Sequence, residues 1–131
     1  MSVQHTETAG DGPLIPRPER TPDALRAACA VVAPQLLPAY DQAKDKALAE
    51  AVEHGSLAPV HACLRHWSAL IEIERHPRTA KEHHRAEYLA QLAASPDEAR
   101  EHLAVAAGIY RDAAVAVSGG REEGRRTGSG S

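Results

Sequence analysis

Histidines are the residues of this chain whose type and spacing could most readily do chemistry. The sequence contains eight of them, and the imidazole ring both titrates near neutral pH and binds metal ions. Glu72 and His76 are four residues apart, as are His83 and Glu87, so each pair would share one helix face. If their helices formed a hairpin, the four side chains could converge on a zinc or nickel ion. Because these spacings match no established metal-binding motif, we keep a metal-binding hairpin only as an alternative and expect no metal or cofactor.

A cysteine and a histidine also have the spacing of a nucleophile and its base. Cys63 precedes His66 by three residues, which would place both side chains on one side of a helix. Cys63 also lies on an apolar stripe with Leu64 and Trp67, however, which predicts a buried, inert thiol. The sequence has neither a glycine-rich phosphate loop nor a Gly-x-Ser-x-Gly elbow. We therefore predict that the protein is not an enzyme and has no catalytic residue.

Basic side chains gather where the third and fourth predicted helices meet. They are Arg75, Arg78, Lys81, His84 and Arg85. These residues could contact a protein partner, or they could contact nucleic acid if the turn belonged to a helix-turn-helix with the fourth helix in a major groove. The net charge of -3 opposes the general attraction on which most DNA-binding proteins depend. We predict a protein partner and keep a DNA-binding regulator as the alternative.

The elements that must position these side chains are predicted to be helices throughout. Alanine is abundant, phenylalanine is absent, and no run of β-branched residues alternates with polar ones. Caps, prolines and apolar spacing predict helices over residues 21–33, 39–54, 56–76, 79–93 and 95–117. Thr21, Ser56, Thr79 and Ser95 are the expected caps. The predicted fold is an all-α, compact bundle of four to five helices.

Two of these helices carry apolar patterns that predict how they pack. The second has a stripe of Tyr40, Ala43, Ala47, Leu48, Ala51 and Val52, which we expect to be buried. The fifth has a narrow seam of Ala99, Leu103, Ala106, Tyr110, Ala113 and Val117. Small side chains let another helix approach closely. We expect this seam to pack within the domain, with a homodimer through the C-terminal helix as the alternative.

Composition also predicts the ends of the domain and its compartment. Residues 1–20 and 118–131 are rich in proline, glycine and polar residues, so we predict disordered tails around a helical domain at residues 21–117. The sequence shows no secretory signal and no apolar run long enough to cross a membrane. The two cysteines form no disulfide framework. We expect a cytoplasmic protein without membrane contact.

The stretch over residues 37–74 resembles a family of small, uncharacterised actinobacterial helical proteins, a domain of unknown function. The resemblance is carried by Pro38, Tyr40 and Asp41, and by residues 57–61 leading to Arg65 and Trp67. It implies the small partner of a toxin-antitoxin-like gene pair, which binds a protein and regulates its own operon. It implies no catalytic residue. We predict a non-catalytic protein-interaction or regulatory protein.

Overall fold

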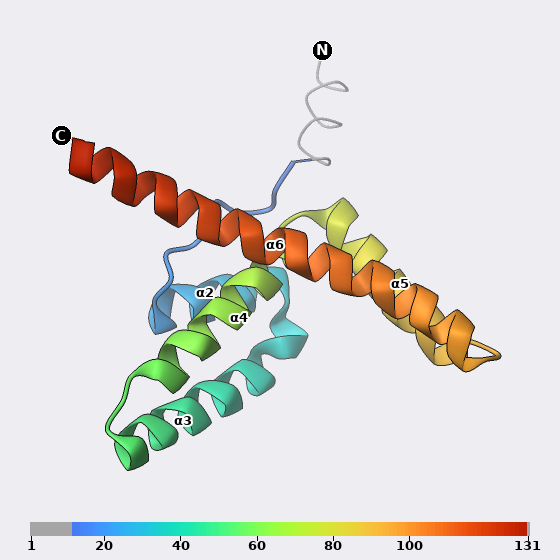
Figure 1. Cartoon of the computed structure of the whole chain (residues 1–131), viewed down its shortest axis with the longest axis horizontal. Helices are drawn as coiled ribbons and strands as arrows, with labels where there is room; N and C mark the ends of the chain where they lie inside the picture. Colours follow the sequence, from blue (N-terminus) through green and yellow to red (C-terminus); the bar gives the residue numbers. More distant parts are fainter. Residues whose placement is uncertain (1–11, 131) are drawn as a thin grey trace.

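The computed structural model describes residues 12–130 of the chain, with side chains described as far as Ser118 (Figure 1). This part of the chain forms five α-helices and one short 3-10 helix, and it contains no β-strand. The elements are α2 (Pro22–Val32), η1 (Pro34–Leu36), α3 (Leu37–His54), α4 (Ala58–Glu74), α5 (Pro77–Leu92) and α6 (Pro96–Gly130). The predicted all-α class is confirmed.

Hydroxyl side chains cap α2 and α6 where the sequence predicted their starts. The Thr21 hydroxyl accepts a hydrogen bond from the amide three residues later at 3.2 Å, and the Ser95 hydroxyl does the same at 3.2 Å. Each bond satisfies one of the first-turn amides that have no partner inside the helix. The start predicted at Thr79 is wrong, because α5 already begins at Pro77. Proline lacks an amide hydrogen and therefore suits this first position.

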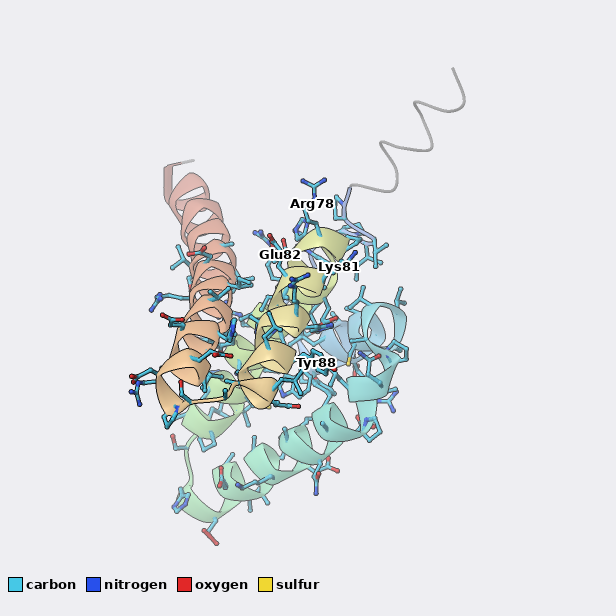
Figure 2. All side chains as sticks on the ribbon, turned by 90° about the vertical axis from the view of Figure 1, so that its right-hand side faces the viewer. Arg78, Lys81, Glu82 and Tyr88 are labelled. Atoms are coloured by element: carbon cyan, nitrogen blue, oxygen red, sulfur yellow. The ribbon has the colours of Figure 1, made fainter. Side chains whose placement is uncertain are left out.

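The central helix of the fold is α4. On one side it packs against α2 and α3, and on the other side it packs against α5 and α6. The helices α5 and α6 form a hairpin, with α6 crossing over the C-terminal half of α4 (Figure 1, Figure 2). From Trp67 to Arg75 every residue of the chain except Leu70 is buried. A helix surrounded by neighbours needs such burial on all of its faces.

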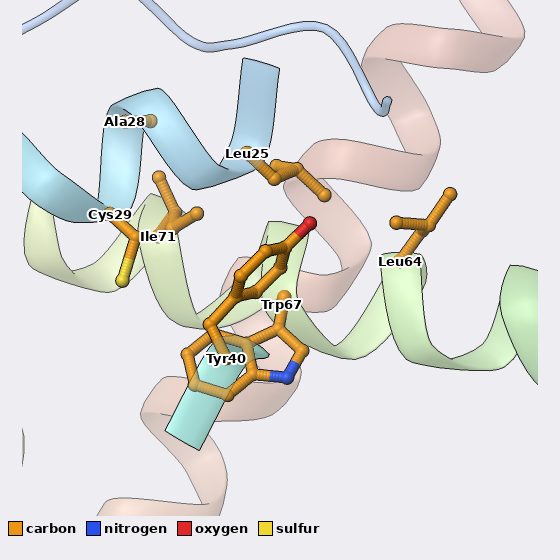
Figure 3. Close-up of a cluster of buried hydrophobic side chains, with 7 residues drawn as sticks. All are labelled: Leu25, Ala28, Cys29, Tyr40, Leu64, Trp67 and Ile71. Atoms are coloured by element: carbon orange, nitrogen blue, oxygen red, sulfur yellow. The ribbon is translucent and has the colours of Figure 1, made fainter. Parts of the chain in front are cut away.

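One hydrophobic cluster lies between α2, α3 and α4 (Figure 3). The rings of Tyr40 and Trp67 meet edge to face, with their centroids 5.3 Å apart, an arrangement that aromatic pairs favour. The Tyr40 hydroxyl donates a hydrogen bond to the Pro22 carbonyl at 2.8 Å, and the Leu25 side chain is fully buried beside the rings. The aromatic residue of the family-like Pro38-Tyr40-Asp41 pattern thus ties α3 to the start of α2.

A second cluster joins α4 to the α5–α6 hairpin through small residues. Its buried members are Ala69, Ile73, Ala80 and Ala113. From the predicted seam, Ala106, Ala113 and Val117 are buried inside the chain, which confirms that the seam packs within the domain. Leu103 is the exception, since it is exposed. A homodimer through this seam would have to displace the contacts that α6 makes with α4 and α5.

The apolar stripe predicted for α3 is narrower in the structure. Tyr40 and Ala47 are buried, but the side chains of Leu48 and Val52 are exposed, with 46% and 85% of their surface accessible. Helix α3 lies at the edge of the molecule, and its main contacts are with α2, η1 and α4. Residues on the far side of its stripe therefore reach solvent, which corrects the expectation of their burial.

The segment over residues 12–20 is packed against the helices, which corrects the tail predicted as far as Arg20. The Leu14 amide donates to the Arg75 carbonyl at 2.8 Å, and Arg75 Nη1 donates to the Ile15 carbonyl at 3.0 Å. Ile15 also packs against the first cluster. Residues 1–11 of that predicted tail lie outside the described residues. At the other end, the helical backbone of α6 continues to Gly130, beyond Val117, where the sequence placed the start of the second tail.

Candidate interaction surface

The outer face of α5 gathers basic and apolar side chains that no neighbouring helix covers. Five of the exposed residues of α5, Arg78, Lys81, Arg85, Tyr88 and Leu92, span an arc of roughly 80° around the helix axis at 3.6 residues per turn. Tyr88 and Leu92 expose 59% and 62% of their surface. We call these five residues the α5 stripe. Figure 2 labels three of them, Arg78, Lys81 and Tyr88, along the outside of the helix.

The opposite face of α5 explains why the stripe faces outward. Ala80, His83 and Ala86 are buried and recur at the three-residue spacing of one helix face. Ala80 belongs to the second cluster, and the small side chains allow α5 to pack closely on its neighbours. The centre of the stripe is therefore turned by about half a revolution from this contact face, so the packing of α5 fixes the direction in which the stripe points.

Of the five basic residues singled out from the sequence, Arg75 cannot contact a partner. It is buried, and its guanidinium donates to both oxygens of Glu72, at 2.9 Å to Oε1 and 3.2 Å to Oε2. Arg17 binds the same carboxylate from the N-terminal segment, at 2.9 Å and 3.0 Å. We call Arg17, Glu72 and Arg75 the Glu72 clasp. The clasp holds residues 12–20 on α4, so Arg75 has a role inside the fold.

His84 is also engaged within the chain. Its Nε2 lies 2.6 Å from Oε2 of Glu74, a buried residue at the end of α4. This contact links α5 to α4 and gives the Glu74 carboxylate a partner, which a buried charge requires. Arg78, Lys81 and Arg85 are exposed, and His84 itself is also exposed beside its contact with Glu74.

The structure does not bring the four candidate metal ligands together. His76 Nε2, in the turn between α4 and α5, lies 3.4 Å from Glu72 Oε2, and His83 Nδ1 lies 3.7 Å from Glu87 Oε1 within α5. Burial alone would raise the pKa of Glu72, but hydrogen bonds from the clasp arginines outweigh it and lower the pKa to about 2. Over residues 12–130, no group of three histidine, cysteine or acidic side chains is arranged to hold a metal ion.

The Cys63 thiol has no sign of activation. It is half-buried beside the first cluster, and burial raises the pKa of the thiol, so it stays protonated at neutral pH. The thiolate is the nucleophilic form. His66, which the sequence paired with this cysteine, instead places its Nδ1 2.8 Å from the Tyr110 hydroxyl on α6.

Sequence reasoning missed both the apolar end of the α5 stripe and the partners of the clasp. Leu92 continues the spacing of Lys81, Arg85 and Tyr88 by four residues, so its position on the stripe has a signal in the sequence. Arg17 lies in a proline-rich segment without periodicity. Its pairing with Glu72 across the chain has no signal in the spacing of residues.

Comparison with known proteins identifies a family for this chain but no activity. None of the described helices is long and apolar enough to cross a membrane. No curated protein and no solved structure matches the chain. Residues 13–125 match a family of unknown function, DUF6247, and this match includes the N-terminal segment, both hydrophobic clusters and the α5 stripe. The chain belongs to the DUF6247 family.

Proposed function

We propose that this protein is a non-catalytic interaction protein that docks the α5 stripe on an acidic and partly apolar surface of a protein partner. The observation that carries the proposal is the composition of the stripe. Three basic side chains, Arg78, Lys81 and Arg85, are followed along the same exposed helix face by Tyr88 and Leu92. Helix faces of this kind are one of the recurring surfaces of protein recognition.

Each half of the stripe has its own physical role in such a complex. Tyrosine and arginine are enriched at the centre of protein interfaces, where burial of an aromatic ring contributes much of the affinity. The cations steer an acidic partner during its approach and fix its orientation. A partner that satisfies both halves presents carboxylates near Lys81 and an apolar pocket near Tyr88.

The sequence resemblance supports a more specific form of this proposal. It implies the small partner of a toxin-antitoxin-like gene pair in an actinobacterium, acting in the cytoplasm. In that role the α5 stripe would bind the partner protein, and the complex would regulate its own operon. The partner would be encoded beside this protein, which gives the binding experiment a defined candidate.

Nucleic acid is the second candidate, because Lys81 and Arg85 are exposed on a helix that follows a short turn. Two of the five predicted contacts are engaged inside the fold, however, since Arg75 binds Glu72 and His84 lies against Glu74. Few phosphate contacts and a net charge of -3 leave little sequence-independent attraction to DNA. The protein partner is therefore favoured.

To test the proposal, the tagged chain is used to capture a binding partner from an extract of the source cells, with and without nuclease. The stripe variant carries Lys81→Glu, Arg85→Glu and Tyr88→Ala. A matched control carries Lys46→Glu, Arg111→Glu and Leu48→Ala, which make the same charge change at residues outside the stripe. Circular dichroism checks that both variants fold.

We expect one stoichiometric protein to be retained by the wild type and by the control, with or without nuclease, and to be lost from the stripe variant. Retention of that protein by the stripe variant would contradict the proposed docking face. Binding that disappears with nuclease, together with a steep dependence on salt, would support the nucleic-acid alternative.

A further inference from the structure

Two adjacent hollows lie between the N-terminal segment and α4, one of them bounded also by α6. One has a volume of about 390 Å³ and is lined by Arg20, His61, Leu64 and Arg65. The other has a volume of about 300 Å³ and is lined by Arg20 and Arg65 together with His66, Tyr110 and Ser118 among others. Because Arg20 and Arg65 line both hollows, we treat them as one site, the Arg20–Arg65 groove.

The described side chains that line the groove include basic and polar groups, and none is acidic. Among them are the side chains of Arg20 and Arg65, two imidazole rings and the hydroxyls of Tyr110 and Ser118. Guanidinium groups present a planar fork of donors that matches the oxygens of phosphate and carboxylate. A surface hollow of this composition concentrates positive potential, so it favours an anion over a neutral ligand.

The contact between His66 and Tyr110 adds a positioned donor. His66 Nδ1 lies 2.8 Å from the Tyr110 hydroxyl, and the two rings are 5.5 Å apart. Burial lowers the pKa of His66, which favours the neutral ring at neutral pH. When the tyrosine hydroxyl donates to Nδ1, the hydrogen of the neutral ring resides on Nε2, which becomes a donor. The bond also holds α4 and α6 together along the wall of the groove.

We propose that the Arg20–Arg65 groove binds the phosphate group of a small phosphorylated molecule. The volume of each hollow is at the lower end of the range for small-molecule sites, which suits a phosphate with a short organic substituent. Arg65 would bind the phosphate oxygens, and the Nε2 of His66 and the hydroxyl of Ser118 would donate further hydrogen bonds. This site is separate from the α5 stripe, and its test does not depend on the proposed protein partner.

Isothermal titration of the full chain tests the proposal with three probes: ribose 5-phosphate, inorganic phosphate and ribose. We expect ribose 5-phosphate to bind with a dissociation constant below about 1 mM, and inorganic phosphate to bind more weakly. Ribose should not bind. In a two-dimensional NMR spectrum, ribose 5-phosphate should shift the amide signals of Arg65, His66 and Tyr110.

Two variants locate the binding. Arg65→Gln should weaken ribose 5-phosphate binding at least tenfold, because it removes a charged donor pair while leaving an exposed polar side chain. Arg111→Gln, which removes an exposed arginine from α6 outside the groove lining, should leave binding unchanged. The proposal is overturned if neither phosphate compound binds at millimolar concentration, if ribose binds as well as its phosphate, or if Arg65→Gln binds like the wild type.

Discussion

At the scale of single residues, Glu72 is a buried carboxylate that pairs with two arginines. Its carboxylate lies between Arg17 and Arg75, with four guanidinium contacts between 2.9 and 3.2 Å. Arg75 also donates to the Ile15 carbonyl, so the same cluster fastens the backbone of the N-terminal segment. Removing the negative charge would leave a buried guanidinium without its counter-charge, which is costly in a protein interior.

Acid should therefore weaken the fold through Glu72. The clasp lowers the folded-state pKa from 4.5 to about 2, so the folded state binds fewer protons than the unfolded chain between these values. The resulting contribution of about 3 kcal/mol is complete above roughly pH 5 and is lost as the pH falls toward 2, with about 2 kcal/mol lost by pH 3. Urea unfolding at pH 7 and pH 3, followed by the fluorescence of Trp67, measures this loss.

The Glu72→Gln variant identifies the group responsible. It should be less stable than the wild type at pH 7 by about 3 kcal/mol, and its stability should fall less between pH 7 and pH 3. Glu101→Gln, at an exposed position of α6, should behave like the wild type at both values. An unchanged pH dependence in Glu72→Gln would show that other carboxyls control acid unfolding.

Tyr40 combines packing with one buried hydrogen bond. Burial raises the pKa of its phenol to about 12, so the hydroxyl stays protonated and donates to the Pro22 carbonyl. Tyr40→Phe keeps the ring against Trp67 but removes this bond, and it should destabilise the fold by about 1–2 kcal/mol. Urea unfolding checks the value. Tyr88→Phe, on the exposed stripe, is the matched control and should change stability by less than about 0.5 kcal/mol.

At the scale of elements, the sequence predicted which segments are helical better than it predicted which side chains of those helices are buried. Local signals were sufficient for the starts at Thr21 and Ser95, because a cap acts within one turn. Burial depends on neighbours instead. Leu48 and Val52 continue an apolar spacing that is typical of a buried face, yet α3 lies at the edge of the molecule and leaves both exposed. The width of a contact face is set by tertiary packing, which periodicity does not contain.

At the candidate surface, too, the sequence identified the basic residues but not which of them are buried. Lys81 and Arg85 were identified by charge and position alone and are exposed as expected. Arg75 belonged to the same basic run, but it is buried because residues 12–20 cross over it and Glu72 pairs with it. That segment has prolines and no periodic pattern, so its place in the fold could be found only from long-range contacts.

The turn between α3 and α4 depends on one glycine. Gly55 ends α3 in the left-handed conformation, with φ at 64°, and a Cβ there would meet nothing within 4 Å. Gly55→Ala should therefore cost about 1 kcal/mol through backbone strain alone, which lowers the melting temperature. Gly108→Ala provides the contrast within helix α6. Its Cβ would meet only a side-chain atom of Arg111 at 3.8 Å, and it should stabilise the protein by up to about 1 kcal/mol. Equal effects from both substitutions would contradict this account.

At the scale of the whole molecule, α4 connects two hydrophobic clusters that have different partners. Trp67 and Ile71 belong to the cluster with α2 and α3, whereas Ala69 and Ile73 belong to the cluster with α5 and α6. Neither pair of helices can keep its buried face covered if α4 unfolds. We therefore expect both halves of the molecule to unfold together, as small single domains usually do.

Ala113→Leu tests this coupling from the far cluster. Ala113 is buried among Ala69, Ile73 and Ala80, where a larger side chain must push α6 away from α4, at a cost of about 1–3 kcal/mol. In urea, the transition followed by Trp67 fluorescence in the other cluster should shift by the same amount as the transition followed by circular dichroism. Ala107→Leu, at an exposed position one face away on α6, should shift neither curve by more than about 0.5 kcal/mol. If Ala113→Leu moved the circular dichroism transition and left the Trp67 transition in place, the α5–α6 hairpin would be a separate folding unit. The Arg20–Arg65 groove, which α4 and α6 line together, would then lie between two parts of the molecule that open independently.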